Sequence, residues 1–206
     1  MALTDARGWQ WLAVDPVPPE PWRNGGGRTR TLFTWPGGGG ADWQLRVSVA
    51  DIERDGPFSA FDGVRRGFAV LQGAGVQLQF GAQQRRLTVD SEPLHFDGAD
   101  APGCTLIGGP TRDLNLMLRG LDGGLLTARP GEAWMPPPGT WAACLCTASS
   151  RLHLGEDWLD APVLGLAIAA PAGVGPCAAL RWTPIDPAAR ACWLWAQLPE
   201  SPSPTP

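Results

Sequence analysis

Glycine and proline occur throughout this chain, which has 27 glycines and 22 prolines among 206 residues. Proline breaks the interior of a helix and glycine weakens it, so the sequence predicts many turns and few long helices. Hydrophobic residues make up 44% of the chain and charged residues 17%, a balance that indicates a folded globular protein rather than a disordered one.

The clearest predicted strand covers residues 43–50, where apolar and polar side chains alternate. Trp43, Leu45, Val47 and Val49 share one face, and Gln44, Arg46 and Ser48 share the other. One face must pack in a core, and the other must look into solvent or into a cavity.

Further short strands are predicted along the rest of the chain, each bounded by turn residues. They cover 67–72, 76–80, 86–89, 94–96, 104–107, 114–118, 141–148, 151–154, 163–169 and 193–198. Short strands at such spacing favour an all-β sandwich or barrel. Residues 73–75 are predicted to form a tight hairpin, residues 136–139 a loop and residues 186–190 a short helix capped by Asp186.

Charge and hydropathy argue against nucleic-acid and membrane partners. The net charge is −4, there is no lysine, and the basic residues form only the pairs Arg65-Arg66 and Arg85-Arg86, which we interpret as solvated strand ends. A nucleic-acid surface needs a denser positive patch. We expect no secretory signal, and the longest apolar stretch, residues 161–170, is too short to span a bilayer.

The five cysteines are odd in number and contain no C-x-x-C pair. Cys144 and Cys146 would share one face of a strand, where they are poorly placed for a disulfide with each other. We therefore expect free, buried thiols in a reducing compartment, which predicts a cytoplasmic protein.

The densest polar cluster is P-W-R-N-G-G-G-R-T-R at residues 21–30. Three consecutive glycines allow a close approach to a ligand, and their N–H groups could form an anion-binding concavity. Arg23, Arg28 and Arg30 add donors that suit carboxylates. The alternative is a surface turn with scattered arginines.

Two other clusters contain candidate pocket residues. In residues 55–66, Phe58 and Phe61 could wall an apolar pocket beside the Ser59 hydroxyl, or could close one end of a core. In residues 109–118, Asn115 and Met117 share one strand face, which could line a cavity or face solvent.

Metal and nucleophile chemistry have little support. The two histidines, His95 and His153, cannot supply a three-histidine site, so we expect no metal and no cofactor. Ser59 does not lie in a G-x-S-x-G elbow. Eleven tryptophans spread along the chain; most suit core packing, although Trp193 and Trp195 could form an interface.

The three clusters occur in one order: residues 21–30, then W-Q-L-R-V-S-V-A-D-I-E-R-D-G-P-F-S-A-F-D-G-V-R-R at 43–66, then P-L-H-F-D-G at 93–98 leading to G-G-P-T-R-D-L-N-L-M at 108–117. Over residues 21–118 this pattern resembles the HutD/Ves family. The resemblance implies a bicupin, with two jelly-roll-like β-barrels in one domain over residues 1–198, followed by a Pro/Ser-rich disordered tail at 199–206. It also implies a link to bacterial histidine utilisation, formylglutamate as the suspected ligand, and no established enzymatic activity.

The leading hypothesis is a metal-free protein that binds a small acidic or polar metabolite. Arg46 and Arg30 would pair with ligand carboxylates. The complete candidate site comprises Trp22, Asn24, Gly27, Thr29, Arg30, Arg46, Ser48, Phe58, Ser59, Phe61, Asn115 and Met117.

Two alternatives remain open, and no catalytic residue is assigned. A metal-free cupin-type isomerase or hydrolase would need an acid or base such as His95, Asp97 or Asp55 in the cavity that contains Arg46. An interaction protein would use its tryptophan-rich second half, for example to form a homodimer.

Overall fold

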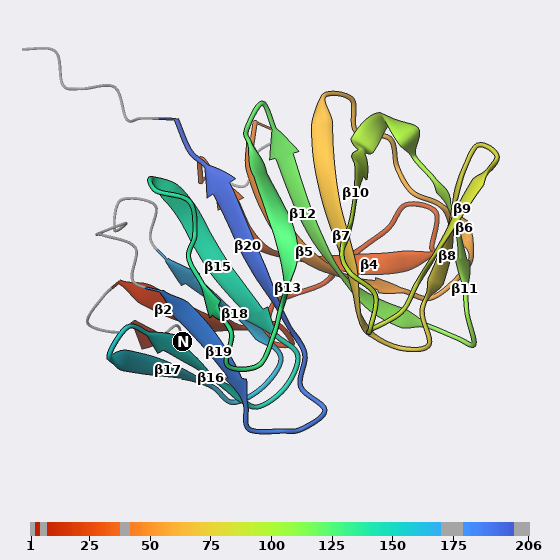
Figure 1. Cartoon of the computed structure of the whole chain (residues 1–206). Helices are drawn as coiled ribbons and strands as arrows, with labels where there is room; N and C mark the ends of the chain where they lie inside the picture. The colour runs from red at the N-terminus through yellow and green to blue at the C-terminus, as the bar shows by residue number, and fades with distance from the viewer. Residues whose placement is uncertain (1–2, 5–7, 38–41, 170–178, 200–206) are drawn as a thin grey trace, which may run out of the picture.

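The computed structural model describes residues 3–4, 8–37, 42–169 and 179–199. As predicted, the fold is nearly all β, with two barrel-like halves side by side (Figure 1). Among the described residues the one helical element is the short 3-10 helix η1 (Gly98–Asp100), and none is long and apolar enough to cross a membrane.

The N-terminal barrel is built from two sheets. Its six-stranded sheet has the order β10-β7-β12-β5-β4-β3, and its four-stranded sheet has the order β6-β11-β8-β9. The bounds are β3 (Glu20–Pro21), β4 (Gly27–Trp35), β5 (Leu45–Ile52), β6 (Gly56–Pro57), β7 (Val64–Gln72), β8 (Val76–Phe80), β9 (Gln83–Leu87), β10 (Leu94–Asp97), β11 (Gly103–Leu106) and β12 (Thr111–Arg119).

The C-terminal barrel repeats this plan with the orders β1-β2-β18-β15-β20-β13 and β14-β19-β16-β17. Its strands are β1 (Leu3–Thr4), β2 (Trp9–Ala13), β13 (Gly123–Ala128), β14 (Ala133–Trp134), β15 (Thr140–Cys146), β16 (Ser150–Leu154), β17 (Asp157–Ala161), β18 (Gly165–Ala169), β19 (Leu180–Pro184) and β20 (Ala191–Gln197). Because β1 and β2 pair within this sheet, the first two strands of the chain belong to the C-terminal barrel, and the following strands form the N-terminal barrel.

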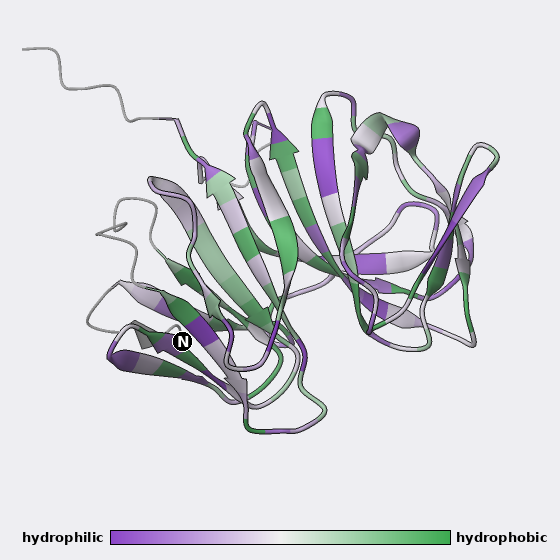
Figure 2. Ribbon diagram, viewed as in Figure 1, coloured by the Kyte–Doolittle hydropathy of each residue, from purple (hydrophilic) through white to green (hydrophobic). Residues whose placement is uncertain are grey.

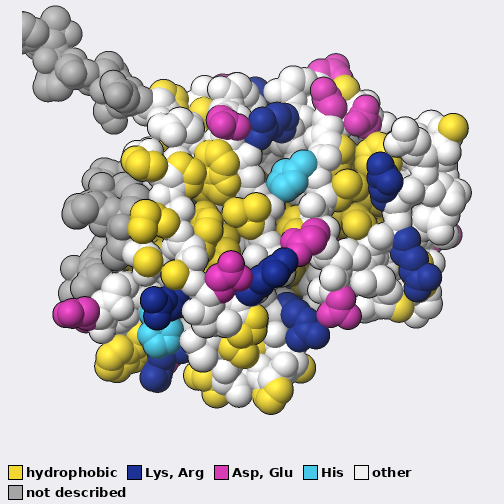
Figure 3. Space-filling view, in the orientation of Figure 1, with side chains coloured by type: hydrophobic (Ala, Val, Ile, Leu, Met, Phe, Trp, Pro, Cys, Tyr) yellow, Lys and Arg dark blue, Asp and Glu magenta, His cyan; other side chains and the backbone are white. Residues whose placement is uncertain are grey.

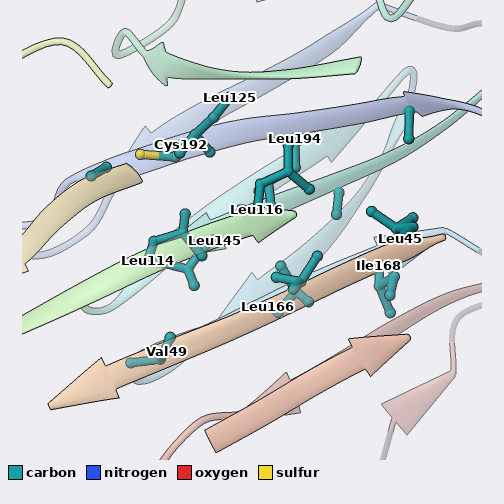
Figure 4. Packing of buried hydrophobic residues seen from close by; sticks show 14 of the residues in the cluster. Leu45, Val49, Leu114, Leu116, Leu125, Leu145, Leu166, Ile168, Cys192 and Leu194 are labelled. Carbon is teal, nitrogen blue, oxygen red and sulfur yellow. The ribbon is translucent and has the colours of Figure 1, made fainter. Parts of the chain in front are cut away.

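The two six-stranded sheets pack face to face through an apolar layer (Figure 4). On β5, Leu45, Val47 and Val49 are fully buried in this layer, against leucines of β12 and of the C-terminal barrel. Figure 2 shows the alternation of hydrophobic and hydrophilic residues along these strands. Since successive side chains point to opposite faces, Arg46 and Ser48 must face the interior of the N-terminal barrel.

Two local predictions were wrong. Residues 73–75 do not close a hairpin, because β7 and β8 belong to different sheets. Gly73 and Gly75 do have positive φ, 96° and 116°, but they carry the chain from one sheet to the other. Residues 186–190 form a turn, in which Asp186 accepts hydrogen bonds from the backbone of Ala188 and Ala189; β20 begins too soon for a helix.

The C-terminal barrel contains its own cluster of buried apolar side chains. Trp193 is buried and stacks on Trp134, with ring centroids 4.9 Å apart, so Trp193 is unavailable for the interface suggested above, and a homodimer stays a prediction. Cys104, Cys144, Cys146 and Cys192 are free and buried. Cys177 and residues 200–206 of the predicted tail lie outside the described residues.

Candidate functional site

A cavity of about 490 Å³ occupies the N-terminal barrel, within the range of roughly 300–1,000 Å³ typical of small-molecule sites. The inner faces of β4, β5, β7 and β12 form one wall, and residues 20–24 and 57–61 form the rest. The lining residues are Glu20, Pro21, Trp22, Arg23, Asn24, Thr29, Arg46, Ser48, Ala50, Ile52, Pro57, Phe58, Ser59, Phe61, Arg66, Asn115 and Met117.

Two arginines face this cavity from strands on either side of β12. Arg46 on β5 and Arg66 on β7 both pair with Met117 on β12. Their Cα atoms are therefore two strand spacings apart, about 10 Å. The next row along the strands contains Ser48 and Asn115, which are cross-strand partners. The wall thus carries two cations and two neutral hydrogen-bonding groups within a few residues.

Arg66 is the more deeply buried cation, with 6% of its surface exposed. Its guanidinium donates to Asn115 Oδ1 and lies over the rings of Phe58 and Phe96, at 4.8 and 5.0 Å from their centroids. Its Nε has no hydrogen-bond partner. Burial, with a further contribution from the charge of Arg46, lowers the pKa of Arg66 to about 10. The charged form of Arg66 is therefore energetically unfavourable in this environment.

Arg46 is half-buried and donates to Thr31 Oγ1 at 3.0 Å. Burial lowers the pKa of Arg46, and the negative charge of Glu20 partly opposes this effect. Across the described ranges, no carboxylate lies within ion-pair distance of either guanidinium. A bound anion would supply the missing partner.

The glycine run positions the rim of the cavity but does not form the expected anion-binding concavity. Gly25 N–H donates to the Trp22 carbonyl at 3.0 Å, and Gly26 N–H donates to Asn24 Oδ1 at 3.0 Å. Two of the three glycine N–H groups are thus used within the turn. This turn places Trp22 so that its indole Nε1 donates to Thr29 Oγ1 at 2.7 Å, which fixes one aromatic wall.

Ten of the twelve candidate residues line the cavity, while Gly27 and Arg30 do not. A Cβ atom on Gly27 would lie 2.3 Å from the Asp51 carbonyl oxygen, so this glycine permits the close pairing of β4 with β5. Arg30 points to the opposite face of β4, where its guanidinium contacts Asp51 at 2.6 Å. The proposed pairing of Arg30 with a ligand is therefore wrong.

Asp51 joins the strands on this outer face. It contacts Arg112 at 2.7 Å and Arg28 at 3.3 Å, and Arg112 also reaches Asp15 at 2.8 Å. Although burial opposes it, hydrogen bonds from Arg112 and Arg30 lower the pKa of Asp51. On this face Arg28, Arg30 and Arg112 are thus paired with carboxylates, in contrast to Arg46 and Arg66 in the cavity.

Sequence reasoning missed Arg66 and Glu20, and also the apolar lining residues Pro21, Ala50, Ile52 and Pro57; it named Arg23 as a possible carboxylate donor but left it out of the candidate site. Arg66 was interpreted as part of a solvated pair, yet it shares the inner face of β7 with the buried Val64 and Phe68. Its spacing of two residues from each of these apolar side chains was a usable signal. Arg85 and Arg86 on β9, in contrast, are exposed as predicted, and Figure 3 shows basic and acidic side chains interspersed on the visible face.

The three candidate acids and bases lie outside the cavity. His95 Nε2 accepts a hydrogen bond from the backbone N–H of Leu125 at 3.0 Å, and burial followed by the charge of Arg65 lowers the pKa of His95. Asp97 caps η1, and Asp55 accepts from the Leu106 N–H at 2.8 Å. Each of the three has a structural hydrogen bond, and the enzyme hypothesis loses these candidates.

Metal ligands are scarce around the barrel. Within the part of the chain that the structure describes, no group of three or more His, Cys, Asp or Glu side chains is placed to hold a metal ion.

Known proteins resemble this chain in both sequence and structure. An uncharacterised 21.2 kDa protein in the hutC 3′ region of Pseudomonas putida is 39% identical over 108 residues, which cover 52% of this chain and 57% of that protein. Protein Ves of Citrobacter koseri is 32% identical over 111 residues, or 53% of this chain and 58% of that protein. The matches thus span little more than half the length of these relatives.

The structural match extends over both barrels. HutD from Pseudomonas fluorescens SBW25 superposes with a TM-score of 0.77 at 26% identity, covering 92% of this chain and 98% of that one. The all-β, two-barrel architecture expected of a bicupin is confirmed. The HutD family model matches residues 15–129, which include every strand of the N-terminal barrel and its cavity, and the chain belongs to the HutD family.

Proposed function

We propose that the cavity of the N-terminal barrel binds a small acidic metabolite, and that the protein moderates histidine utilisation through this binding. The observation that supports the proposal is the pair Arg46 and Arg66, two guanidiniums that face one cavity without a carboxylate partner among the described residues.

The charges that line the cavity favour an anion. Its lining contains three arginines and one carboxylate, that of Glu20. Burial has already removed water from Arg66, so a carboxylate placed beside it would form charge-assisted hydrogen bonds in a poorly solvated site. The Cα atoms of Arg46 and Arg66 are about 10 Å apart. The two side chains can therefore bind a compound with two negative groups, or both can contact a single anion.

Formylglutamate is the first compound to test. It carries two carboxylates, and its size suits a cavity of about 490 Å³. The relative in the hutC 3′ region and the structural match to HutD support a place in histidine utilisation. A protein that sequesters such an intermediate would limit its effective concentration without catalysing a reaction.

Isothermal titration calorimetry with formylglutamate, urocanate, histidine and glutamate tests this proposal. Arg46→Met should weaken binding about 30-fold or more, because removing one partner of a buried, hydrogen-bonded charge pair costs about 2–5 kcal/mol and about 1.4 kcal/mol corresponds to tenfold.

Arg28→Met is the matched control, because Arg28 lies on the same sheet but pairs with Asp51 and Glu53 outside the cavity. It should bind as the wild type does. The proposal fails if the folded wild type gives no heat with any of the four compounds, or if Arg46→Met binds as well as Arg28→Met.

A further inference from the structure

The polar side chains of the inner wall offer hydrogen-bond donors to a ligand, because most of their acceptor atoms already have partners within the protein. Arg46 and Arg66 are donors only. Asn115 can donate and accept, but its Oδ1 already accepts from Arg66. The Asn115 side chain lines the cavity, so the group that it has left for a ligand is its Nδ2 amide, which is a donor.

The neighbouring groups repeat this arrangement. Thr29 Oγ1 accepts from the Trp22 indole, so its hydroxyl proton is left for a ligand. Asn24 Oδ1 accepts from the Gly26 N–H, which again leaves an amide donor. Ser48, which is buried in the same wall, has a hydroxyl that can donate.

The one carboxylate among the lining residues lies at the edge of the cavity. Glu20 is exposed, on the short strand β3, whereas Arg66, Asn115 and Ser48 are buried. A ligand group that carries its own donors, such as an ammonium, therefore finds a charged acceptor only at the outer rim. Deeper in the cavity it would meet two cations and the amide donor of Asn115.

We propose that Asn115, oriented by Arg66, is a specificity-determining residue that excludes ammonium-bearing groups from the inner cavity. This inference rests on the proposed function and narrows its ligand class. When the two carboxylates of a diacid pair with Arg46 and Arg66, the whole ligand lies in the inner cavity, which therefore takes N-acylated or amine-free acids rather than free amino acids.

Glutarate and glutamate test the inference, because they share a carbon skeleton and differ by one ammonium group. Calorimetry on the wild type should show glutarate binding at least about tenfold more tightly than glutamate, since like charges placed together in a desolvated site repel each other. Asn115→Asp keeps the side-chain shape and an acceptor for Arg66, but replaces the amide donor by a carboxylate. It should weaken glutarate binding and bring the affinity ratio to one or below.

The Asn115→Leu variant distinguishes the specificity role of Asn115 from a purely structural role in positioning Arg66. Leucine removes the amide donor and acceptor without adding charge. It should therefore weaken the binding of both glutarate and glutamate, and it should reduce the ratio of their affinities less than Asn115→Asp does. Thermal unfolding of each variant checks that it is folded.

Three results would count against the inference. A wild type that binds both compounds equally would overturn it, as would an Asn115→Asp variant that keeps the wild-type ratio; either result leaves the proposed binding function standing. A wild type that binds neither these acids nor formylglutamate would overturn both proposals.

Discussion

Arg66→Met should leave the stability of the ligand-free protein nearly unchanged while abolishing anion binding. Burial and the charge of Arg46 lower the pKa of Arg66 to about 10. Each pKa unit corresponds to about 1.4 kcal/mol, so keeping this side chain charged in the folded protein costs on the order of 3 kcal/mol. Because the folded-state pKa is the lower one, this cost is fully present below pH 10 and is relieved only as the pH rises above it.

The contacts of Arg66 offset most of this cost. Methionine would leave Asn115 Oδ1 without its donor, at about 1–3 kcal/mol. It would also lose the cation–π contacts with Phe58 and Phe96, together worth about 1–2 kcal/mol. These contacts sum to about 2–5 kcal/mol against a cost of about 3 kcal/mol, so the predicted change in the free energy of unfolding lies between a gain of about 1 kcal/mol and a loss of about 2 kcal/mol.

Differential scanning calorimetry provides the assay. For a domain of this size, 1 kcal/mol shifts Tm by about 2–4 °C. The comparison variant is Leu116→Ala, which removes a buried leucine from the layer between the barrels and should cost about 2–5 kcal/mol. The reasoning is refuted if Arg66→Met lowers Tm as much as Leu116→Ala does, because Arg66 would then be a stabilising residue rather than one held for a ligand.

Three further outcomes are expected. Gly27→Ala should lower Tm by several degrees, because its Cβ would clash with the Asp51 carbonyl, whereas Gly37→Ala should leave Tm unchanged, because a Cβ on Gly37 has open space around it. Equal shifts of Tm in the two variants would contradict this steric argument. Burial raises the pKa of Asp113 to about 8, so the folded protein keeps a proton that the unfolded chain releases near pH 4. The free energy of unfolding of the wild type should therefore decrease as the pH rises from about 4 to about 8. Urea titrations of Asp113→Asn over this range should show a weaker dependence of stability on pH, and a dependence equal to that of the wild type would refute the role of Asp113. The four buried cysteines should react with Ellman's reagent only after unfolding, so more than one thiol per native chain would be inconsistent with their burial.

The alternation along residues 43–50 was sufficient to predict the strand and to place Arg46 opposite its apolar face, but it left open whether Arg46 faces solvent or a cavity. It could not show that the apolar face packs on a second barrel, since that depends on leucines far along the chain, such as Leu145 and Leu194. Trp43 shows the limit of the pattern, because it precedes the strand and packs with Val64 and Met117 instead of Leu45.

Glycine content concealed part of the architecture. Strand β4 was missed because its first residue, Gly27, ends a glycine run that favours a loop, and β13 begins with Gly123 and Gly124. In both places glycine allows a close approach between strands: a Cβ on Gly123 would lie 2.5 Å from the Trp195 carbonyl oxygen. Such contacts between distant segments cannot be read from local propensity.

A crystal structure of the protein grown with saturating formylglutamate tests the central claim most directly. The account predicts ligand density inside the N-terminal barrel, with carboxylate oxygens about 3 Å from guanidinium nitrogens of both Arg46 and Arg66. A ligand bound elsewhere, or a cavity that stays empty of it at saturation, would contradict the account.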